Sequence, residues 1–283
     1  MPAVQQVSSA QRLVDTYFGT SAPYWRDVYG GETVSATIYR ERRDVVLRWV
    51  DELGSDAGER ALDIGCGAGS FSVALAKRGF QVRAIDPVPD MLKQTSQLVR
   101  ERGVEHRVAV ESGDAHDLIY PDNSFGLVLA IGVTPWLHSL PSALQEITRV
   151  LKPGGYVVIS ADNALRLNYW LDPRFCPGHA TIRSGVGKLL RRLGCWREPH
   201  ASTYSVRSFD HALKRASLEK IHCTTVGFGP FTFFEHELLS DSIGVALHHR
   251  LKKFVTNKPV LRSSGSQYLV LARKADASNS SPA

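Results

Sequence analysis

Short apolar segments alternate along this chain with longer segments in which apolar residues recur at helical spacing. The short segments are predicted to be β-strands at residues 60–64, 81–86, 106–111, 125–131, 156–161, 221–228 and 267–273. The longer segments are predicted to be helices at residues 36–53, 70–78, 89–102, 142–151 and 208–217.

Strands that alternate with helices are typical of a parallel sheet covered by helices. The final strand differs from the others, because a polar turn at residues 262–266 leads directly into it. We therefore expect an α/β fold with a Rossmann-like, doubly wound, seven-stranded sheet. This sheet is expected to be mainly parallel, with an antiparallel last strand and helices on both faces.

Two stretches interrupt the alternation. Residues 1–35 precede the core, are rich in aromatic side chains and are predicted to form an N-terminal cap or lid. Residues 162–204 are far longer than an ordinary loop between a strand and a helix, which favours a lid, a substrate-binding wall or an interface. The main domain is placed at residues 36–274, with 162–204 as an insertion, and residues 275–283 are expected to form a disordered tail.

Composition indicates a folded protein with localised positive charge. Apolar residues make up 43% of the chain, and no apolar run is long enough to predict a membrane-spanning helix. The net charge of +6 is concentrated in residues 183–198 and 242–262, where apolar residues recur at helical spacing. Each strip fits either a helix packed on the domain or an interfacial helix on anionic lipid. The cysteines lack metal-ligand spacing, so no metal is expected, and we predict a cytoplasmic protein with peripheral membrane contact.

A glycine-rich loop at residues 65–69 leads from the first strand into a helix. Glycines allow a tight turn and let a ligand approach the backbone, and the first N–H groups of the helix can bind an anionic group. Asp63 ends the first strand, and Asp86 ends the next one, where a carboxylate can bind both ribose hydroxyls. Asp114 follows the third strand, placed to reach an adenine amino group. The pattern indicates a nucleoside-containing ligand.

A dinucleotide site is the main rival interpretation of this loop. Its fingerprint requires a third glycine at the position of Ser70, and it usually has an apolar residue in place of Asp63. An acid at that point favours a ligand with a positively charged amine, such as an amino-acid-bearing nucleoside.

Five motifs carry a resemblance to a known family: ALDIGCGAG at 61–69, AIDPVPDM at 84–91, GDA at 113–115, FGLVLAIG at 125–132 and VLKPGGY at 150–156. In this order and spacing the chain resembles the class I S-adenosylmethionine-dependent methyltransferases, in the small-molecule branch called type 11. The resemblance implies S-adenosyl-L-methionine as the cofactor. It also implies these binding residues: Asp63, Gly65, Cys66 and Gly67 for methionine, Asp86 for ribose, Pro87, Met91, Asp114 and Ala115 for adenine, and Ile131 and Gly132 under the sulfonium.

The chain departs from the family at Gly126, where other members commonly have Asp after the phenylalanine. That acid is usually structural. We therefore expect a local loss of polar contacts, with cofactor binding intact.

The methyl acceptor is expected near the loop after the fourth strand. His138 in this loop is the leading candidate for a general base, and His236 is the second. A histidine that only bonds a backbone group is an equal alternative for His138. Aromatic residues that could form an acceptor pocket, with ordinary core as the alternative, are Tyr17, Tyr24, Trp136, Phe231 and Phe233.

These features predict an S-adenosylmethionine-dependent methyltransferase for a small, apolar or lipid-linked acceptor, at oxygen in preference to nitrogen. An RNA or tRNA methyltransferase is one alternative, suggested by the pI of about 9.2. It is disfavoured because basic and aromatic residues are not interleaved as in a stacking platform for nucleic acid. A non-catalytic cofactor-binding protein is the other, disfavoured by the intact loop and by Asp63 and Asp86.

Overall fold

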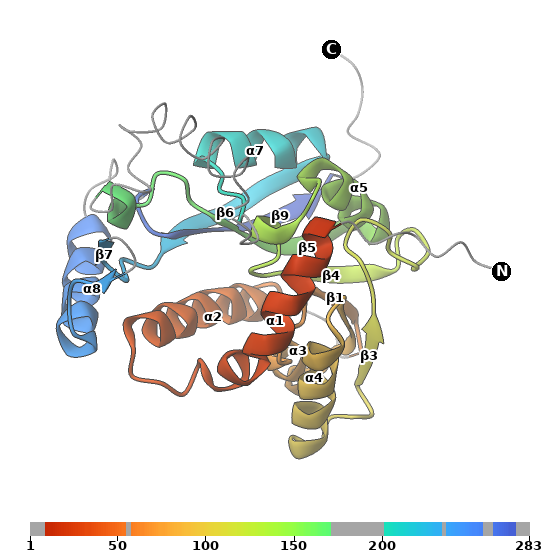
Figure 1. Cartoon of the computed structure of the whole chain (residues 1–283). Helices are drawn as coiled ribbons and strands as arrows, with labels where there is room; N and C mark the ends of the chain where they lie inside the picture. Colours follow the sequence, from red (N-terminus) through yellow and green to blue (C-terminus); the bar gives the residue numbers. More distant parts are fainter. Residues whose placement is uncertain (1–8, 55–57, 171–200, 234–235, 257–262, 276–283) are drawn as a thin grey trace, which may run out of the picture.

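The computed structural model describes residues 9–54, 58–170, 201–233, 236–256 and 263–275 (Figure 1). Its centre is a seven-stranded sheet with the strand order β3-β2-β1-β4-β5-β9-β6. The strands of the sheet are β1 (Arg60–Ile64), β2 (Gln81–Asp86), β3 (Val108–Ser112), β4 (Phe125–Ala130), β5 (Leu151–Asp162), β6 (Leu218–Val226) and β9 (Gln267–Lys274). A separate antiparallel pair is formed by β7 (Thr232–Phe233) and β8 (His236–Glu237).

Strand β9 lies antiparallel between β5 and β6. The other neighbouring pairs, from β3 to β5, are parallel. The predicted mainly parallel sheet with an antiparallel last strand is therefore confirmed. Strand β5 begins earlier than expected, because Leu151 pairs with Phe125 before the register shifts to Leu127 and Tyr156.

Helices cover both faces of the sheet, as predicted. They are α1 (Ser9–Asp27), α2 (Val34–Glu52), α3 (Ser70–Lys77), α4 (Pro89–Glu101), α5 (Leu140–Val150), α7 (Val206–Arg215) and α8 (Asp241–Thr256), with short 3-10 turns η1 (Thr134–Trp136) and η2 (Leu167–Trp170). One face packs on α5 and α7 through a core that includes Leu144 and Phe209. The other packs on α2, α3 and α4 through a core that includes Trp49 and Leu75.

Serine and threonine side chains fix where three of these helices begin. Thr33, Ser139 and Ser205 each accept a hydrogen bond from a backbone N–H in the first turn of α2, α5 and α7. Such caps satisfy donors that have no partner within the helix. These caps explain why α2, α5 and α7 each begin two residues earlier than the apolar pattern alone predicts.

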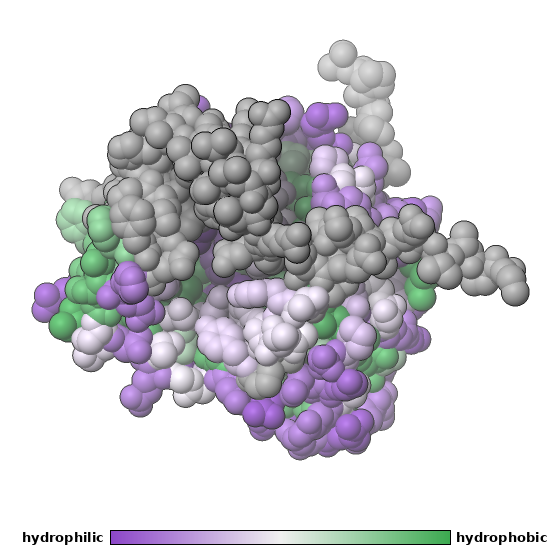
Figure 2. Space-filling model, viewed as in Figure 1, coloured by the Kyte–Doolittle hydropathy of each residue, from purple (hydrophilic) through white to green (hydrophobic). Residues whose placement is uncertain are grey.

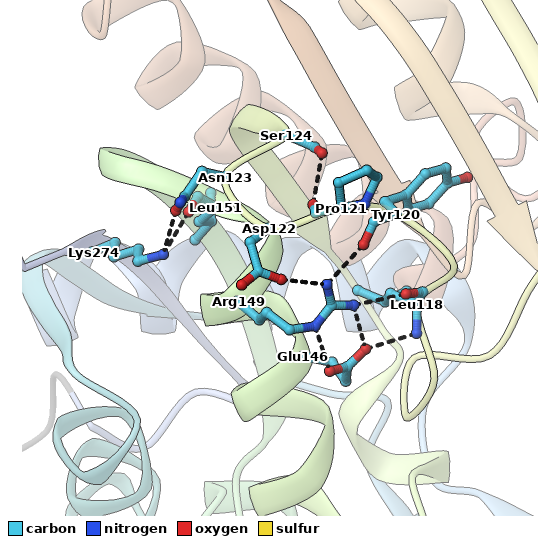
Figure 3. A network of polar contacts seen from close by, with 10 residues as sticks. All are labelled: Leu118, Tyr120, Pro121, Asp122, Asn123, Ser124, Glu146, Arg149, Leu151 and Lys274. Carbon is cyan, nitrogen blue, oxygen red and sulfur yellow. Dashed lines mark hydrogen bonds and ion pairs between the residues drawn. The ribbon is translucent and has the colours of Figure 1, made fainter.

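An arginine of α5 fastens the loop between β3 and β4 (Figure 3). Arg149 donates 2.7 Å hydrogen bonds to the carbonyls of Leu118 and Tyr120, and it also pairs with Glu146 and Asp122. The carboxylate of Glu146 in turn accepts the N–H of Leu118 at 2.9 Å. This network holds the chain that follows Asp114, at the rim of the cavity described below.

Helix α8 packs on α2 through a buried polar contact. His248 lies 3.1 Å from a carboxylate oxygen of Glu41, and Lys252 lies 2.7 Å from the other oxygen. The Nδ1 atom of His248 accepts the N–H of Phe228, so Nε2 is the nitrogen that carries hydrogen toward Glu41. The second predicted basic strip thus includes a helix packed on the domain.

Several expectations lie outside the described residues. These are most of the insertion, the first basic strip and all of the tail except residue 275. Within the described part of the chain, no helix is both long enough and apolar enough to cross a membrane.

Candidate active site

A cavity of about 240 Å³ opens at the carboxyl ends of the parallel strands. Its floor is the glycine loop after β1, and its sides are the ends of β2, β4 and β5, the loop after β3 and parts of α1 and α2. Ligands of open α/β sheets bind at this edge, where the strand order reverses between β1 and β4. Position alone therefore makes this cavity the candidate active site.

The glycine loop has a conformation that other residues would not adopt easily. Gly65, Gly67 and Gly69 have φ angles of 64°, 54° and 85°, in the left-handed region. A Cβ at Gly65 would come within 2.5 Å of a Val133 methyl group, whereas at Gly67 it would meet no atom within 4 Å. Gly67 lines the cavity, so its open side is space for a ligand.

Thr95 of α4 holds the loop in place from below. Its hydroxyl donates a 2.6 Å hydrogen bond to the carbonyl of Gly67 and lies 3.5 Å from the sulfur of Cys66. Burial raises the pKa of the Cys66 thiol well above its ordinary value. The Cys66 thiol is therefore neutral and lines the cavity, and its predicted contact with methionine stays a prediction. Thr95 is a positioning residue that the sequence pattern did not reveal.

Asp86 has a geometry suited to ribose. One of its oxygens accepts the N–H of Gly67 at 3.0 Å, and the other accepts the N–H of Val88 at 2.9 Å. Both bonds fix the carboxylate at the cavity wall. A fixed carboxylate beside the open face of Gly67 fits the nucleoside of S-adenosylmethionine.

Asp63 is not among the residues that line the cavity. It is buried beneath the loop, where the hydroxyl of Ser72 donates a 2.6 Å hydrogen bond to it. Burial raises the pKa of Asp63 to about 7, with a further contribution from the charge of Asp86, and the Ser72 bond opposes the rise. The structure thus shows Asp63 supporting the loop, and its predicted contact with methionine stays a prediction.

Asp114 lies at the cavity rim and is engaged by a histidine. Its carboxylate accepts the N–H of His116 at 2.9 Å and lies 2.6 Å from the Nδ1 atom of the same residue. The hydrogen bond from His116 lowers the pKa of Asp114. Ala115, the other predicted adenine contact here, also lines the cavity.

His138 is exposed and is not part of the cavity lining, whereas His116 is. The two rings stack with their centroids 3.5 Å apart. The Nε2 atom of His116 accepts the N–H of Ser139 at 3.3 Å, so both nitrogens of His116 have protein partners. The role of His138 as a base stays a prediction.

Aromatic side chains of α1 form the outer wall of the cavity. Phe18 and Trp25 line it and pack on Val88 and Met91, which follow Asp86. The ring of Phe18 also meets Trp136 edge-on, with centroids 5.0 Å apart. Pro87 and Met91, the predicted neighbours of adenine, thus lie in an apolar, aromatic part of the lining.

Of the residues predicted to form the acceptor pocket, the structure places one in the cavity lining and the others outside it. Trp136 lines the cavity. Tyr17 stacks on the outside of Trp136 at 5.7 Å, and Tyr24 is 51% exposed. Phe231 is buried away from the cavity, while Phe233 and His236 are exposed and pair with each other in the β7–β8 ladder. These last assignments stay predictions.

The sequence pattern did not reveal several lining residues, among them Tyr39 and Arg42 of α2, Asp162 at the end of β5, and Gln267 at the start of β9. Arg42 stands between Ile38 and Val46 on the buried face of α2, so a cation within an apolar helical stripe was the available signal. Asp162 ends its strand as Asp86 does, which was also an available signal, whereas Tyr39 and Gln267 have no local signal. Among the described residues, no three His, Cys, Asp or Glu side chains are grouped to hold a metal ion.

Predicted sulfonium-side residues Ile131 and Gly132 close the floor of the cavity beside Gly65. The glycine loop, the fixed Asp86 and the seven-stranded sheet with antiparallel β9 define a class I S-adenosylmethionine-dependent methyltransferase domain. Residues 62–159, about a third of the chain, match the family model described as "Methyltransferase domain".

Curated relatives match the chain over part of its length. A malonyl-(acyl-carrier protein) O-methyltransferase of Serratia marcescens is 36% identical over 119 residues, which is 42% of this chain and 44% of the relative. A 2-methyl-6-phytyl-1,4-hydroquinone methyltransferase of Synechocystis sp. is 32% identical over 164 residues, 53% of this chain and 51% of the relative. The chain thus spans about half the length of these relatives.

Solved structures resemble almost the whole chain. The magnesium protoporphyrin IX methyltransferase of Synechocystis PCC 6803, with bound S-adenosylhomocysteine, has a TM-score of 0.64 at 15% identity and covers 94% of this chain and 100% of its own. The cyclase SpnF has a TM-score of 0.61 at 19% identity, with 95% and 97% covered. At such identities the likeness shows the fold alone, and it includes a protein named for another reaction.

Proposed function

We propose that this protein is a methyltransferase that transfers the methyl group of S-adenosylmethionine to a small acceptor with a large apolar part. One observation carries the proposal: the open face of Gly67 and the fixed carboxylate of Asp86 share a cavity with the aromatic wall of Phe18, Trp25 and Trp136. The first two suit the nucleoside, and the wall suits an apolar acceptor.

The protein side of such a reaction is mainly positioning. The sulfonium supplies an electrophilic methyl group, and transfer requires the acceptor atom in line with the carbon–sulfur bond. The side chain of Val133 fills the space beside Gly65, so the floor of the cavity is closely packed there. Aromatic rings over the opening exclude water, and a fixed floor holds the two reactants at the required distance.

Oxygen is the proposed acceptor atom. A hydroxyl must lose its proton during methyl transfer, and Asp162 is a carboxylate that lines the cavity at the end of β5. Burial raises the pKa of Asp162, which makes it a better proton acceptor, while the charges of Arg166 and Arg42 oppose the rise. The names of the relatives include both O- and N-methyltransferases. Identification of the methylated product is therefore needed to establish which acceptor atom receives the methyl group.

The direct test is methyl transfer from labelled S-adenosylmethionine to separated lipid, polar and nucleic-acid extracts. We expect label in a lipid or apolar small-molecule product, resistant to acid if it is an ether and labile to base if it is an ester. Label in RNA or DNA would instead support the nucleic-acid alternative. Binding of S-adenosylhomocysteine without transfer to any extract would support a non-catalytic protein, and absence of binding would exclude both.

Contact with a membrane surface is a second part of the proposal. Helix α8 exposes Ile243 and Phe254, at 56% and 57%, beside the basic residues Arg250 and Lys253. Figure 2 shows hydrophobic surface at this end of the molecule, where Figure 1 places α8. Apolar and cationic side chains on one helix suit the surface of an anionic bilayer.

Vesicle sedimentation tests this contact. The protein is expected to sediment with vesicles of phosphatidylcholine and phosphatidylglycerol more than with phosphatidylcholine alone. Ile243→Ser with Phe254→Ser should release it, whereas Ile221→Ser, which removes an exposed apolar side chain on β6, should not. Equal sedimentation of all three proteins would exclude α8 as the contact.

A further inference from the structure

His116 is a cavity-lining histidine whose ring is held at both nitrogens. It lies in the loop after β3, its side chain is 9% exposed, and it lines the cavity. Its Nε2 atom accepts the backbone N–H of Ser139, the residue that caps α5. Because a neutral imidazole carries one hydrogen, this bond places the hydrogen of His116 on Nδ1. The opposite tautomer would set two N–H donors against each other at Ser139.

The Nδ1 hydrogen is directed at one oxygen of Asp114. Nδ1 lies 2.6 Å from Oδ1, and the backbone N–H of His116 donates to the same oxygen at 2.9 Å. Within the described part of the chain, Oδ2 of Asp114 has no hydrogen-bond partner. The Asp114 side chain is 54% exposed and lines the cavity. One oxygen of this carboxylate is therefore committed to the protein, and the other is available to a ligand.

Helix α5 holds this loop at two points. The first is the contact between Ser139 and His116, and the second is the 2.9 Å hydrogen bond from the N–H of Leu118 to the carboxylate of Glu146. The ring of His138 covers one side of the His116 ring, with the centroids 3.5 Å apart and the planes 25° from parallel. The orientation of His116, and with it that of the Asp114 carboxylate, is thus fixed by packing outside the cavity.

A carboxylate with one fixed free oxygen selects a ligand that donates a hydrogen there. An ionised carboxylate accepts hydrogen bonds and donates none. The hydrogen bond from His116 lowers the pKa of Asp114, so the acceptor-only form is maintained. An exocyclic amine offers a hydrogen to such an oxygen, whereas a ring C–H does not replace it and a carbonyl oxygen is repelled.

We propose that His116 is the positioning residue that makes Asp114 selective for the amino group of the cofactor's base. It does so by engaging Oδ1 through both Nδ1 and its backbone N–H, which leaves Oδ2 to face the ligand. The inference rests on the proposed function, and it adds a residue that acts through Asp114 without touching the base. The tautomer of His116, set by Ser139, is the feature on which the selectivity depends.

Calorimetry with two nucleosides tests this role. S-adenosylhomocysteine carries the amino group, and in its 6-deamino analogue a hydrogen replaces that group alone. We expect the wild-type protein to bind the first about ten- to a hundred-fold more tightly, as a hydrogen bond to a charged group allows.

Two substitutions divide the functions of the imidazole. In His116→Gln the amide oxygen can still accept the N–H of Ser139, but no donor stands at the Nδ1 position, so the preference for the amino group should fall towards unity. In His116→Asn the amide nitrogen takes the place of Nδ1, and most of the preference should return. His106→Gln, which changes an exposed histidine before β3, should retain the full preference.

The ratio of the two affinities separates this role from a structural one. If His116 only supports the loop, His116→Gln weakens both nucleosides equally, their ratio stays at the wild-type value, and the inference is overturned. An equal loss of the ratio in His116→Gln and His116→Asn would also overturn it, because the Nδ1 hydrogen bond would not be the cause. If wild-type protein binds both nucleosides equally, the inference fails while the proposed function stands. If it binds neither, the proposed function fails first.

The tautomer is also measurable in the wild-type protein, so the inference remains testable if the variants do not fold. Long-range proton–nitrogen NMR spectra of His116 should show the hydrogen on Nδ1 and a lone pair on Nε2. A hydrogen on Nε2 would overturn the inference, because Nδ1 could then not donate to Asp114.

Discussion

The carboxylate of Glu59 occupies the space in which a side chain at residue 126 would begin. Glu59 directly precedes β1, and Gly126 is the second residue of the neighbouring strand β4. The sequence led us to expect lost polar contacts at Gly126, where related proteins commonly have an aspartate. Instead, an acid is present at this place in the fold, but it comes from the residue that precedes the neighbouring strand β1.

Because Glu59 fills the space beside Gly126, substitutions at the two positions should affect stability in a coupled way. Gly126→Asp places a second carboxylate against Glu59, and we expect the free energy of unfolding to fall by about 1–2 kcal/mol at pH 7. In a Glu59→Ala background, the same substitution should cost less than half as much. Urea unfolding of the four proteins measures the coupling, and strictly additive effects would show that the two positions do not share this space.

The buried carboxyl of Asp63 predicts a pH-dependent stability. Its pKa of about 7, against an ordinary value of 3.8, means that the folded chain keeps a proton that the unfolded chain releases. The stabilisation is complete below pH 3.8 and is lost as the pH rises through about 7. From pH 5 to pH 8 the wild-type protein should lose roughly 3 kcal/mol relative to Asp63→Asn, which cannot ionise. The free energy of unfolding of both proteins is measured by urea unfolding across this pH range. The same pH dependence in both proteins would contradict the prediction.

Asp86 should be required for cofactor affinity. The carboxylate of Asp86 accepts hydrogen bonds from the backbone N–H groups of Gly67 and Val88. In Asp86→Asn the amide nitrogen replaces one of the two oxygens, so one of these N–H groups faces a donor and loses its hydrogen bond. We expect S-adenosylhomocysteine to bind at least about ten-fold more weakly, measured by calorimetry. Asp90→Asn is the control, because Asp90 is exposed, lies outside the cavity lining and pairs with Lys93 at 2.8 Å. Equal losses in both variants would argue against a ribose site at Asp86.

Two tryptophans should report ligand binding. Trp25 and Trp136 line the cavity, whereas Trp49 is buried against the sheet outside it. Addition of S-adenosylhomocysteine is expected to change the tryptophan emission of the wild-type protein and of Trp49→Phe. The change should be lost when Trp25 and Trp136 are both phenylalanine. A signal that persists in this double variant would place the ligand elsewhere.

The part of the site that sequence could predict is the part encoded by adjacent residues. Glycines in one loop and an acid at a strand end form a local pattern, and Gly65, Gly67 and Asp86 line the cavity together. The segments that form the strands of the sheet could also be predicted, because apolar patterns typical of strands and of helices alternate clearly along the chain. Ends of elements were less accurate where a capping side chain such as Ser139, or the bulge after Leu151, decides the boundary.

The remaining lining residues come from contacts between distant elements. Tyr39 and Arg42 reach the cavity because α2 docks on the sheet, and Gln267 reaches it because β9 inserts beside β5. Asp63 shows the reverse case, since its position in the motif suggested a ligand contact but Ser72 holds it beneath the loop. Periodicity describes which face of an element is buried, and it does not describe which partner that face will meet.

Strand β9 has a consequence for how the molecule is assembled. It fills the gap between β5 and β6, and its pairing partner Asp162 precedes it by about a hundred residues. Until Gln267–Lys274 is inserted, β5 and β6 each present an unpaired strand edge, a surface prone to association with other chains. Because Gln267 belongs to the cavity, the pocket is complete only when this last strand is in place. A ligand that needs the whole pocket therefore selects finished molecules over partly assembled ones.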